Sequence, residues 1–89
     1  MKYNEKAVEA LKPFNNRRKE LEIDFMIQRQ FNGIVNALTM VVEESGWNQD
    51  VFDSLCEAVR NLINTLDPEK IRELNPLFDD CVSVVQKYP

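Results

Sequence analysis

Apolar residues recur every three or four positions along most of this chain, and charged or amide residues occupy the positions between them. This spacing gathers apolar side chains on one face of a helix, whereas a strand would alternate them at every second residue. The chain has only 2 glycines and 4 prolines, which also favours helices over a turn-rich β fold. We therefore predict an all-α protein, a small bundle of four to five helices that forms a single domain over residues 1–89.

The segment from Arg17 to Glu44 is predicted as one long central helix around which the others pack, with Asn15 or Asn16 as its N-cap. The segment contains no proline, and its main apolar stripe consists of Ile23, Ile27, Phe31, Ile34, Val35, Leu38, Val41 and Val42. As an uninterrupted helix it would extend for roughly 40 Å. A small domain does not need a helix of that length to build one core, which suggests that a partner chain covers part of it.

Two further helices are predicted on either side of this central segment. The first runs from the cap residue Asn4 to about Lys12, where Pro13 ends it because a proline disfavours the α conformation in the residue before it. After Gly46, which suits a helix C-terminus, the next helix runs from Asn48 to about Leu66 with a clear apolar stripe.

The last part of the chain begins a helix at Asp67-Pro68, a cap residue followed by proline in the first helical position. The apolar period then continues to the end of the chain, but Pro76 interrupts it. We expect a break or a kink at Pro76, with residues 68–74 as a short helical segment of their own.

A second apolar face is expected on the central helix, away from its main stripe. It contains Met26, Gly33, Ala37 and Met40, in which the two small residues allow another backbone to approach and the methionines offer adaptable contacts. This face would either cover the first helix of the same chain or contact another subunit. Since the first helix is too short to cover all of it, we predict a homo-oligomer, most simply a dimer, with these four residues at its interface.

A cluster of cations, Arg17, Arg18 and Lys19, occupies the predicted first turn of the central helix. Basic side chains and free backbone N–H groups at a helix N-terminus can together hold a phosphate or a carboxylate. Tyr3 or Phe14 would be available to stack on a ligand such as a nucleotide. The plainer interpretation is that the cluster is simply a solvated helix start.

Charge is unevenly distributed within a net charge of −4. Residues 1–30 carry a net charge of +2, and residues 31–89 carry −6. An acidic body makes nucleic acid the least favoured partner, because duplex binding depends on a basic surface. Since no apolar run is long enough to span a bilayer, we expect no membrane segment and a cytoplasmic location.

Residue types that carry chemistry are scarce in this sequence. The chain has no histidine and no Cys-x-x-Cys pair, so Cys56 and Cys81 are expected to be buried free thiols rather than metal ligands. The acidic pairs Asp79-Asp80 and Glu43-Glu44 do not converge, because neighbours on a helix point about 100° apart. We therefore predict no enzyme, no metal and no cofactor.

The remaining features favour a function in protein binding. We expect a small acidic interaction module that acts as an inhibitor, adaptor or regulator by binding another protein, as a homo-oligomer. The alternative is a binding protein for a small anionic ligand such as a nucleotide, held by the cluster at Arg17–Lys19.

Overall fold

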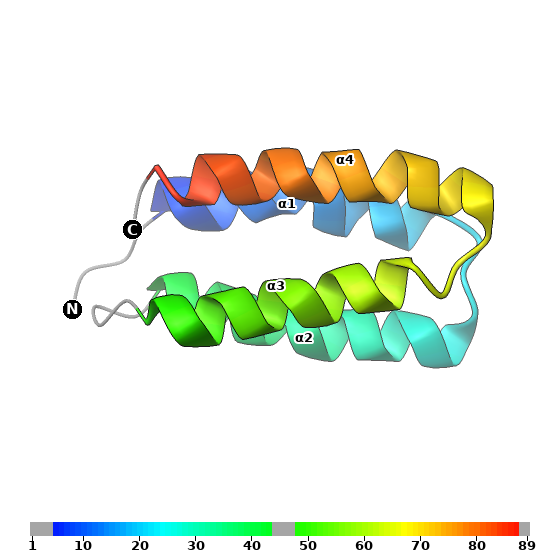
Figure 1. The fold of residues 1–89 in the computed structure, drawn as a ribbon, viewed down its shortest axis with the longest axis horizontal. Coiled ribbons are helices and arrows are strands. Elements are labelled where there is room, and N and C mark those ends of the chain that lie inside the picture. Colours follow the sequence, from blue (N-terminus) through cyan, green and yellow to red (C-terminus); the bar gives the residue numbers. More distant parts are fainter. Residues whose placement is uncertain (1–4, 44–47, 88–89) are drawn as a thin grey trace.

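The computed structural model describes residues 5–43 and 48–87. Within these two ranges the chain forms four α-helices and no strand: α1 (Glu5–Glu20), α2 (Phe25–Glu43), α3 (Gln49–Ile63) and α4 (Pro68–Val85). Successive helices run in opposite directions and build a bundle with extents of 39 × 21 × 21 Å (Figure 1). The predicted all-α bundle is confirmed. None of the helices in these ranges is both long and apolar enough to cross a bilayer.

The four helices are arranged as two layers. α1 lies beside α4 in one layer and α2 beside α3 in the other, and contacts of α1 with α2 and of α3 with α4 join the layers (Figure 1). Each helix therefore packs on two neighbours. The prediction that one helix lies at the centre is wrong, because all four have similar lengths and equivalent places in the bundle.

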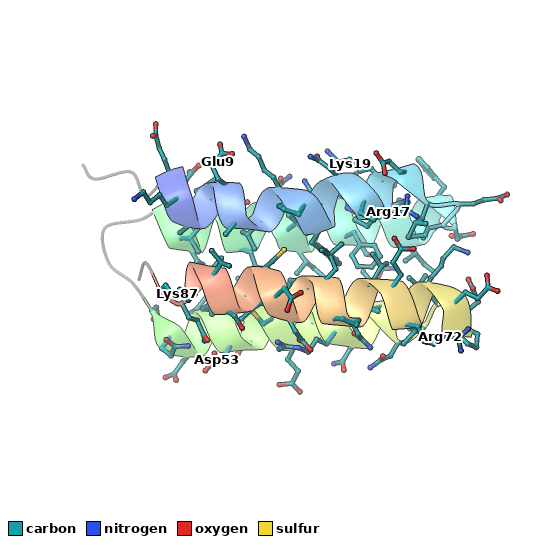
Figure 2. All side chains as sticks on the ribbon, turned by 90° about the horizontal axis from the view of Figure 1, so that it is seen from above. Glu9, Arg17, Lys19, Asp53, Arg72 and Lys87 are labelled. Atoms are coloured by element: carbon teal, nitrogen blue, oxygen red, sulfur yellow. The ribbon has the colours of Figure 1, made fainter. Side chains whose placement is uncertain are left out.

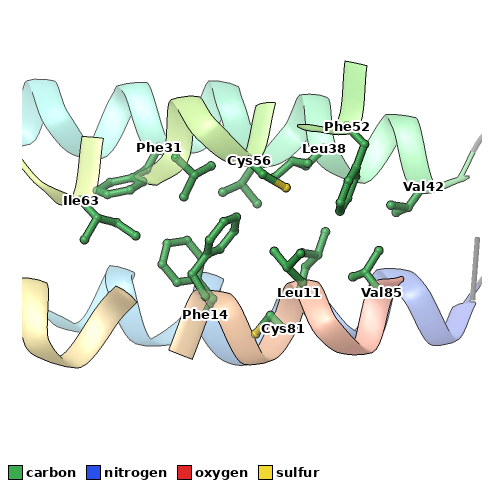
Figure 3. Packing of buried hydrophobic residues seen from close by; sticks show 14 of the residues in the cluster. Leu11, Phe14, Phe31, Leu38, Val42, Phe52, Cys56, Ile63, Cys81 and Val85 are labelled. Carbon is green, nitrogen blue, oxygen red and sulfur yellow. The ribbon is translucent and has the colours of Figure 1, made fainter. Parts of the chain in front are cut away.

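The core fills the space between the two layers (Figure 3). Its largest apolar side chains are four phenylalanines, one from each helix, and all are almost completely buried: Phe14, Phe31, Phe52 and Phe78. The ring of Phe14 lies 4.9 Å from that of Phe78 and 6.0 Å from that of Phe31, in edge-to-face orientations. α1 thus reaches both α4 and α2 through one aromatic side chain.

The long central helix predicted from Arg17 to Glu44 is wrong, because the chain turns at residues 21–24. Asp24 explains where α2 begins. Its side-chain Oδ1 accepts a hydrogen bond from the backbone N–H of Met26 at 2.9 Å, and its carbonyl accepts one from Gln28 at 2.9 Å. These are the bonds of an N-cap residue, so Asp24 caps α2. The predicted caps, Asn15 and Asn16, lie inside α1.

Pro13 does not end the first helix as predicted, since α1 continues through it to Glu20. Proline lacks the N–H that would bond to the carbonyl of Glu9, at a cost of about 3 kcal/mol in a helix interior. The burial of side chains that precede and follow the proline in the sequence offsets this cost. Leu11, Phe14 and Arg18 fall on one face of the continuous helix, and all three are buried.

Pro76 is likewise enclosed in one helix, so the separate segment predicted for residues 68–74 is wrong. The proline is exposed, whereas Leu74 and Phe78 on either side of it are fully buried in the core. A helix that keeps both of these side chains in phase also keeps Pro76 on the solvent side. Packing against α1 and α3 therefore outweighs the missing backbone hydrogen bond.

The predicted starts of the last two helices are confirmed. Asn48 caps α3, and its side-chain oxygen accepts a hydrogen bond from the N–H of Val51 at 3.1 Å. Asp67 precedes α4 with Pro68 in the first helical position, although its carboxylate bonds to Lys70 Nζ at 2.7 Å instead of a backbone N–H. The predicted cap residues Asn4 and Gly46 lie outside the described residues.

Candidate interaction surface

The outer face of α2 carries the most exposed hydrophobic side chains of the described residues. Phe25, Met26 and Met40 expose 71%, 60% and 61% of their surface. Gly33 lies between the two methionines and is exposed, and Ala37 next to it is half-buried. We call these five residues the α2 outer surface. It contains all four residues predicted from the sequence as an oligomer interface, and the structure brings them together on one helix face.

Helix geometry explains why this face is open. Met26, Gly33 and Met40 are spaced seven residues apart, so they recur along one line of α2. Phe31 and Val35 lie on the opposite side of the helix and are buried in the core. α1 and α3 contact α2 from the core side. The expectation that the first helix could cover this face within one chain is therefore wrong.

The α2 helix is also nearly free of charge. Among its 19 residues, only Arg29 and Glu43 are charged, whereas α1 carries eight charged residues in 16. The other three helices show the usual solvated exterior, on which charged side chains such as Lys19 and Asp53 project outward (Figure 2). Arg29 is the charged residue on this side of α2, and its guanidinium carbon lies 5.9 Å from the centre of the exposed Phe25 ring. A low density of charge around exposed Met side chains is typical of the centre of a protein–protein interface.

Gly33 has no packing reason within the described part of the chain. A Cβ atom built on it would meet no described atom within 4 Å. Glycine in the interior of a helix costs about 1 kcal/mol relative to alanine. The bundle alone would therefore be more stable with another residue here. A close approach by a second protein would explain the glycine.

Two other exposed hydrophobic residues occur in the described ranges, and they lie apart from this surface. Val51 on α3 and Val84 on α4 expose 43% and 39% of their surface. Each is a single side chain among charged and polar neighbours, which is normal on protein surfaces. The α2 outer surface differs from them because Met26, Gly33 and Met40 recur along one line of the helix.

The basic cluster at Arg17, Arg18 and Lys19 lies in the last turn of α1, not in the first turn of a helix as predicted. At a helix C-terminus the dipole favours cations, and the backbone there presents carbonyl oxygens instead of N–H groups. The cluster therefore stabilises the end of α1, and the helix N-terminal basis of the predicted anion site is wrong.

Arg18 is buried, with only 2% of its surface exposed. Its guanidinium donates hydrogen bonds to Asn15 Oδ1 at 2.6 and 2.9 Å, to Gln28 Oε1 at 2.9 Å and to Asn32 Oδ1 at 2.5 Å. The guanidinium carbon also lies 5.8 Å from the centre of the Phe31 ring. Burial lowers the pKa of Arg18 from its ordinary value. These contacts make Arg18 a residue that joins α1 to α2.

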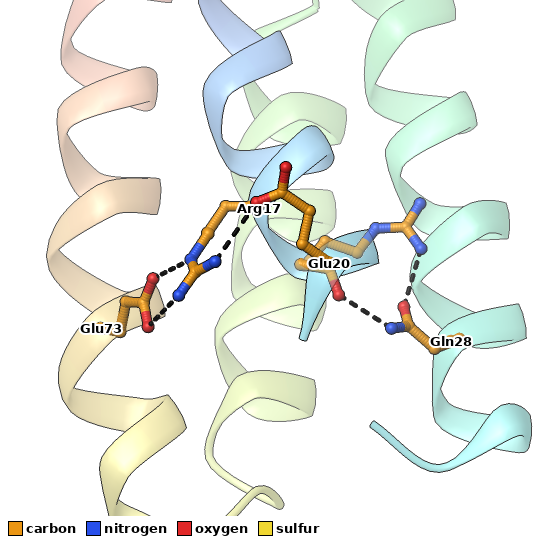
Figure 4. Close-up of polar contacts among 5 residues, drawn as sticks. Arg17, Glu20, Gln28 and Glu73 are labelled. Atoms are coloured by element: carbon orange, nitrogen blue, oxygen red, sulfur yellow. Dashed lines mark hydrogen bonds and ion pairs between the residues drawn. The ribbon is translucent and has the colours of Figure 1, made fainter. Parts of the chain in front are cut away.

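Arg17 points to the other side, toward α4 (Figure 4). It donates from Nε to Glu73 and from Nη2 to Glu73 Oε1 at 3.2 Å, and from Nη1 to Glu20 at 3.2 Å. The hydrogen bond from Arg17 lowers the pKa of Glu73. Because both partners are substantially exposed, this ion pair contributes little to stability.

The two aromatic residues predicted to stack on a ligand do not support an anion site. Phe14 is 1% exposed and belongs to the core. Tyr3 lies outside the described residues. Of the three clustered cations, Arg17 and Arg18 are engaged on different sides of α1, and Lys19 is exposed. The predicted ligand-binding residues therefore do not converge on one point.

A small groove lies between α1 and α2. It has a volume of about 170 Å³ and is lined by Val8, Leu11, Lys12, Asn15, Val35 and Thr39. Sites for drug-sized ligands usually measure about 300–1,000 Å³. Thr39 directs its hydroxyl to the Val35 carbonyl at 2.9 Å, so it is already hydrogen-bonded.

Carboxylates and thiols do not form a metal site in the parts of the chain that the structure describes, where no group of three or more possible ligands occurs. Asp79 accepts hydrogen bonds from Arg60 at 3.0 and 3.1 Å. Cys56 and Cys81 are buried free thiols, as predicted. Burial raises the pKa of Cys56 to about 11 and also raises the pKa of Cys81.

The fold and its surfaces define an up-and-down four-helix bundle with three exposed large apolar side chains, Phe25, Met26 and Met40, on α2. Comparisons with protein-family models, with curated proteins and with solved structures return no match.

Sequence patterns alone missed Asp24 and the role of Arg18. A single aspartate before an apolar run is a weak start signal, and the stripe continued through it without a change of phase. In the sequence Arg18 stands between two other cations, and whether an arginine is buried depends on which residues surround it in the fold.

Proposed function

We propose that this protein is a small helical protein-interaction module, an inhibitor, adaptor or regulator that acts by binding another protein through the α2 outer surface. The observation that supports this most directly is the line from Met26 to Met40, two largely exposed methionines with an unobstructed glycine between them, on a helix with two charges in 19 residues.

The energetic basis is the burial of apolar surface. Covering Met26, Met40 and Phe25 would remove large side chains from water, at about 25 cal/mol for each Å² of apolar surface. Methionine side chains are flexible enough to fit an irregular partner surface. One cation must be desolvated or moved when this face is covered, because the Arg29 guanidinium lies over the Phe25 ring.

The experiment compares capture of proteins from the native cell by three forms of the chain. The double variant Met26→Asp/Met40→Asp places two carboxylates on the α2 outer surface, and the wild type is the reference. Val51→Asp is the matched control, because Val51 is also exposed but lies on α3. Circular dichroism first verifies that all three forms are folded.

We expect the double variant to lose at least tenfold in captured partner, and Val51→Asp to retain the wild-type level. Capture of the same proteins in equal amounts by all three forms would show that binding does not use the α2 outer surface.

A further inference from the structure

The two methionines of the α2 outer surface are placed symmetrically about Gly33. Met26 lies seven residues before this glycine and Met40 seven residues after it. In a helix with a rise of 1.5 Å per residue, each methionine is therefore about 10 Å from Gly33 along the axis. A second α2 helix running in the opposite direction would place Gly33 on Gly33 and each Met26 on a Met40. The surface is thus complementary to itself.

We propose that the partner bound by the α2 outer surface is a second copy of this chain, paired through antiparallel α2 helices about a twofold axis at Gly33. This inference rests on the proposed function, since both need the same surface to be an interface. In such an isologous contact one patch serves both subunits, so every exposed apolar residue of the line finds a partner.

Close approach of the helices depends on Gly33. Its missing side chain leaves the backbone open at the point where the two helices would be nearest, and no described atom blocks that approach. Ala37, the other small residue, lies one turn further on the same face. Packing within the bundle does not explain Gly33, whereas a close contact between two α2 helices at the twofold axis does.

The residues beside this line also match in an antiparallel pair. On one flank, Arg29 lies four residues before Gly33 and Asn36 three residues after it, so the guanidinium would face the amide of the partner subunit's Asn36. On the other flank, Gln30 would face the partner subunit's Ala37 by the same spacing. The two arginines would be separated by eight residues, or about 12 Å, along the helix axis.

The net charges of the helices favour α2 as the site of self-association. α1 carries a net charge of +2, and α3 and α4 each carry −2, whereas α2 is neutral. Two copies that met through α1, α3 or α4 would bring like charges together. Contact between α1 of one copy and α4 of the next would pair opposite charges, but this heterologous arrangement would leave free ends and extend into a chain.

The first measurement is the mass of the purified chain by sedimentation equilibrium over a range of concentrations. We expect a mass approaching twice the chain's 10.4 kDa. Gly33→Arg adds a side chain at the contact point, where a Cβ atom would meet no described atom of the same chain within 4 Å, and should raise the dimer dissociation constant at least tenfold. Ser54→Arg adds the same charge to an exposed position of α3 and should leave the dissociation constant unchanged.

The second measurement fixes the direction of the two helices. The reagent is a short bismaleimide, and Gly33 is left unchanged so that the close approach at the axis is kept. Met26→Cys alone should not cross-link, since 14 residues of helix, about 21 Å, would separate the thiols. An equal mixture of Met26→Cys and Met40→Cys chains should give mixed pairs only. The wild type, whose two thiols are buried, is the blank.

The outcomes separate this inference from the proposed function. A monomer mass at high concentration would overturn self-association, and the proposed function would survive if Met26→Asp/Met40→Asp still lost a captured partner. Efficient cross-linking of Met26→Cys to itself would instead show a parallel pair and overturn the twofold axis at Gly33. Growth beyond a dimer that is reversed by salt would favour the contact between α1 and α4.

Discussion

Arg18 and Gln28 hydrogen-bond to each other in both directions across the turn between α1 and α2. The Arg18 guanidinium donates to Gln28 Oε1 at 2.9 Å, and the Gln28 amide donates to the Arg18 carbonyl at 2.8 Å (Figure 4). The second bond satisfies a carbonyl at the C-terminal end of α1, where the helix itself supplies no donor. The pair therefore closes the end of one helix and fixes the start of the next.

Replacing Arg18 should destabilise the bundle strongly. We expect Arg18→Ala to lower the free energy of unfolding by roughly 2–4 kcal/mol, because a buried aliphatic stem and several charge-assisted hydrogen bonds are lost together. Lys19→Ala, at the exposed neighbouring position, should change it by no more than about 0.5 kcal/mol. Urea denaturation followed by circular dichroism gives both values. Equal effects of the two substitutions would mean that Arg18 is a surface residue.

Phe14 should be a core residue and not a ligand-stacking residue. Its ring packs on Phe31 and Phe78, so we expect Phe14→Ala to cost about 3–5 kcal/mol of folding free energy. Val51→Ala, at an exposed site, is the control and should change stability by about 0.5 kcal/mol or less. Thermal unfolding monitors both variants. A melting temperature unchanged by Phe14→Ala would contradict the packing described for α1.

Pro13→Ala should stabilise the protein, since α1 passes through this position as a helix. Alanine restores the missing N–H and removes the ring from the helix, although the unfolded chain gains freedom, and we expect a net gain of about 1–2 kcal/mol. The midpoint of urea unfolding should rise. If Pro13 instead ended the helix, the substitution would remove a restraint from a turn and lower the midpoint.

Cys56 should make stability fall at alkaline pH. Its pKa is raised from about 9 to about 11, so between these values the folded state holds the proton more tightly than the unfolded state. This contribution is fully present below pH 9 and is lost as the pH rises toward 11. A shift of this size corresponds to about 2–3 kcal/mol.

The measurement is the difference between the wild type and Cys56→Ala in urea unfolding at several pH values from 8 to 11. The wild type should lose more stability over this interval than the variant, in which only the other alkaline groups titrate. Parallel curves for the two proteins would show that the Cys56 thiol is not protected by burial.

In the second half of the chain, capping residues and the apolar period were sufficient to predict where α3 and α4 begin, but not that α4 continues through Pro76. Asn48 and Asp67-Pro68 mark the starts of α3 and α4 because capping depends on residues within one turn of the chain. The buried positions of α3, among them Phe52, Cys56 and Val59, follow the helical spacing of apolar residues in the sequence. Capping and apolar spacing depend on residues close together in the chain, so they can be read from the sequence alone.

The same is true of the α2 outer surface. Met26, Gly33, Ala37 and Met40 share a helix face at fixed angular spacing, whatever the rest of the chain does. Whether that face is exposed to solvent does not follow from the spacing of its residues. It depended on where α1 packs, and only the arrangement of the four helices shows that α1 leaves this face uncovered.

The continuity of α1 and α4 and the position of the turn between α1 and α2 were decided by tertiary packing. Pro13 and Pro76 are helix breakers by their own chemistry, yet burial of Leu11, Phe14, Leu74 and Phe78 beside them stabilises continuous helices. The apolar stripe runs unbroken from Ile23 to Ile27, although Asp24 begins a new helix between them. The sequence determines which faces are apolar, because that is a property of residue spacing. Where a helix stops, and whether Arg18 is exposed or buried, depends on contacts between residues far apart in the chain, and the free energy of those contacts exceeds the local preferences.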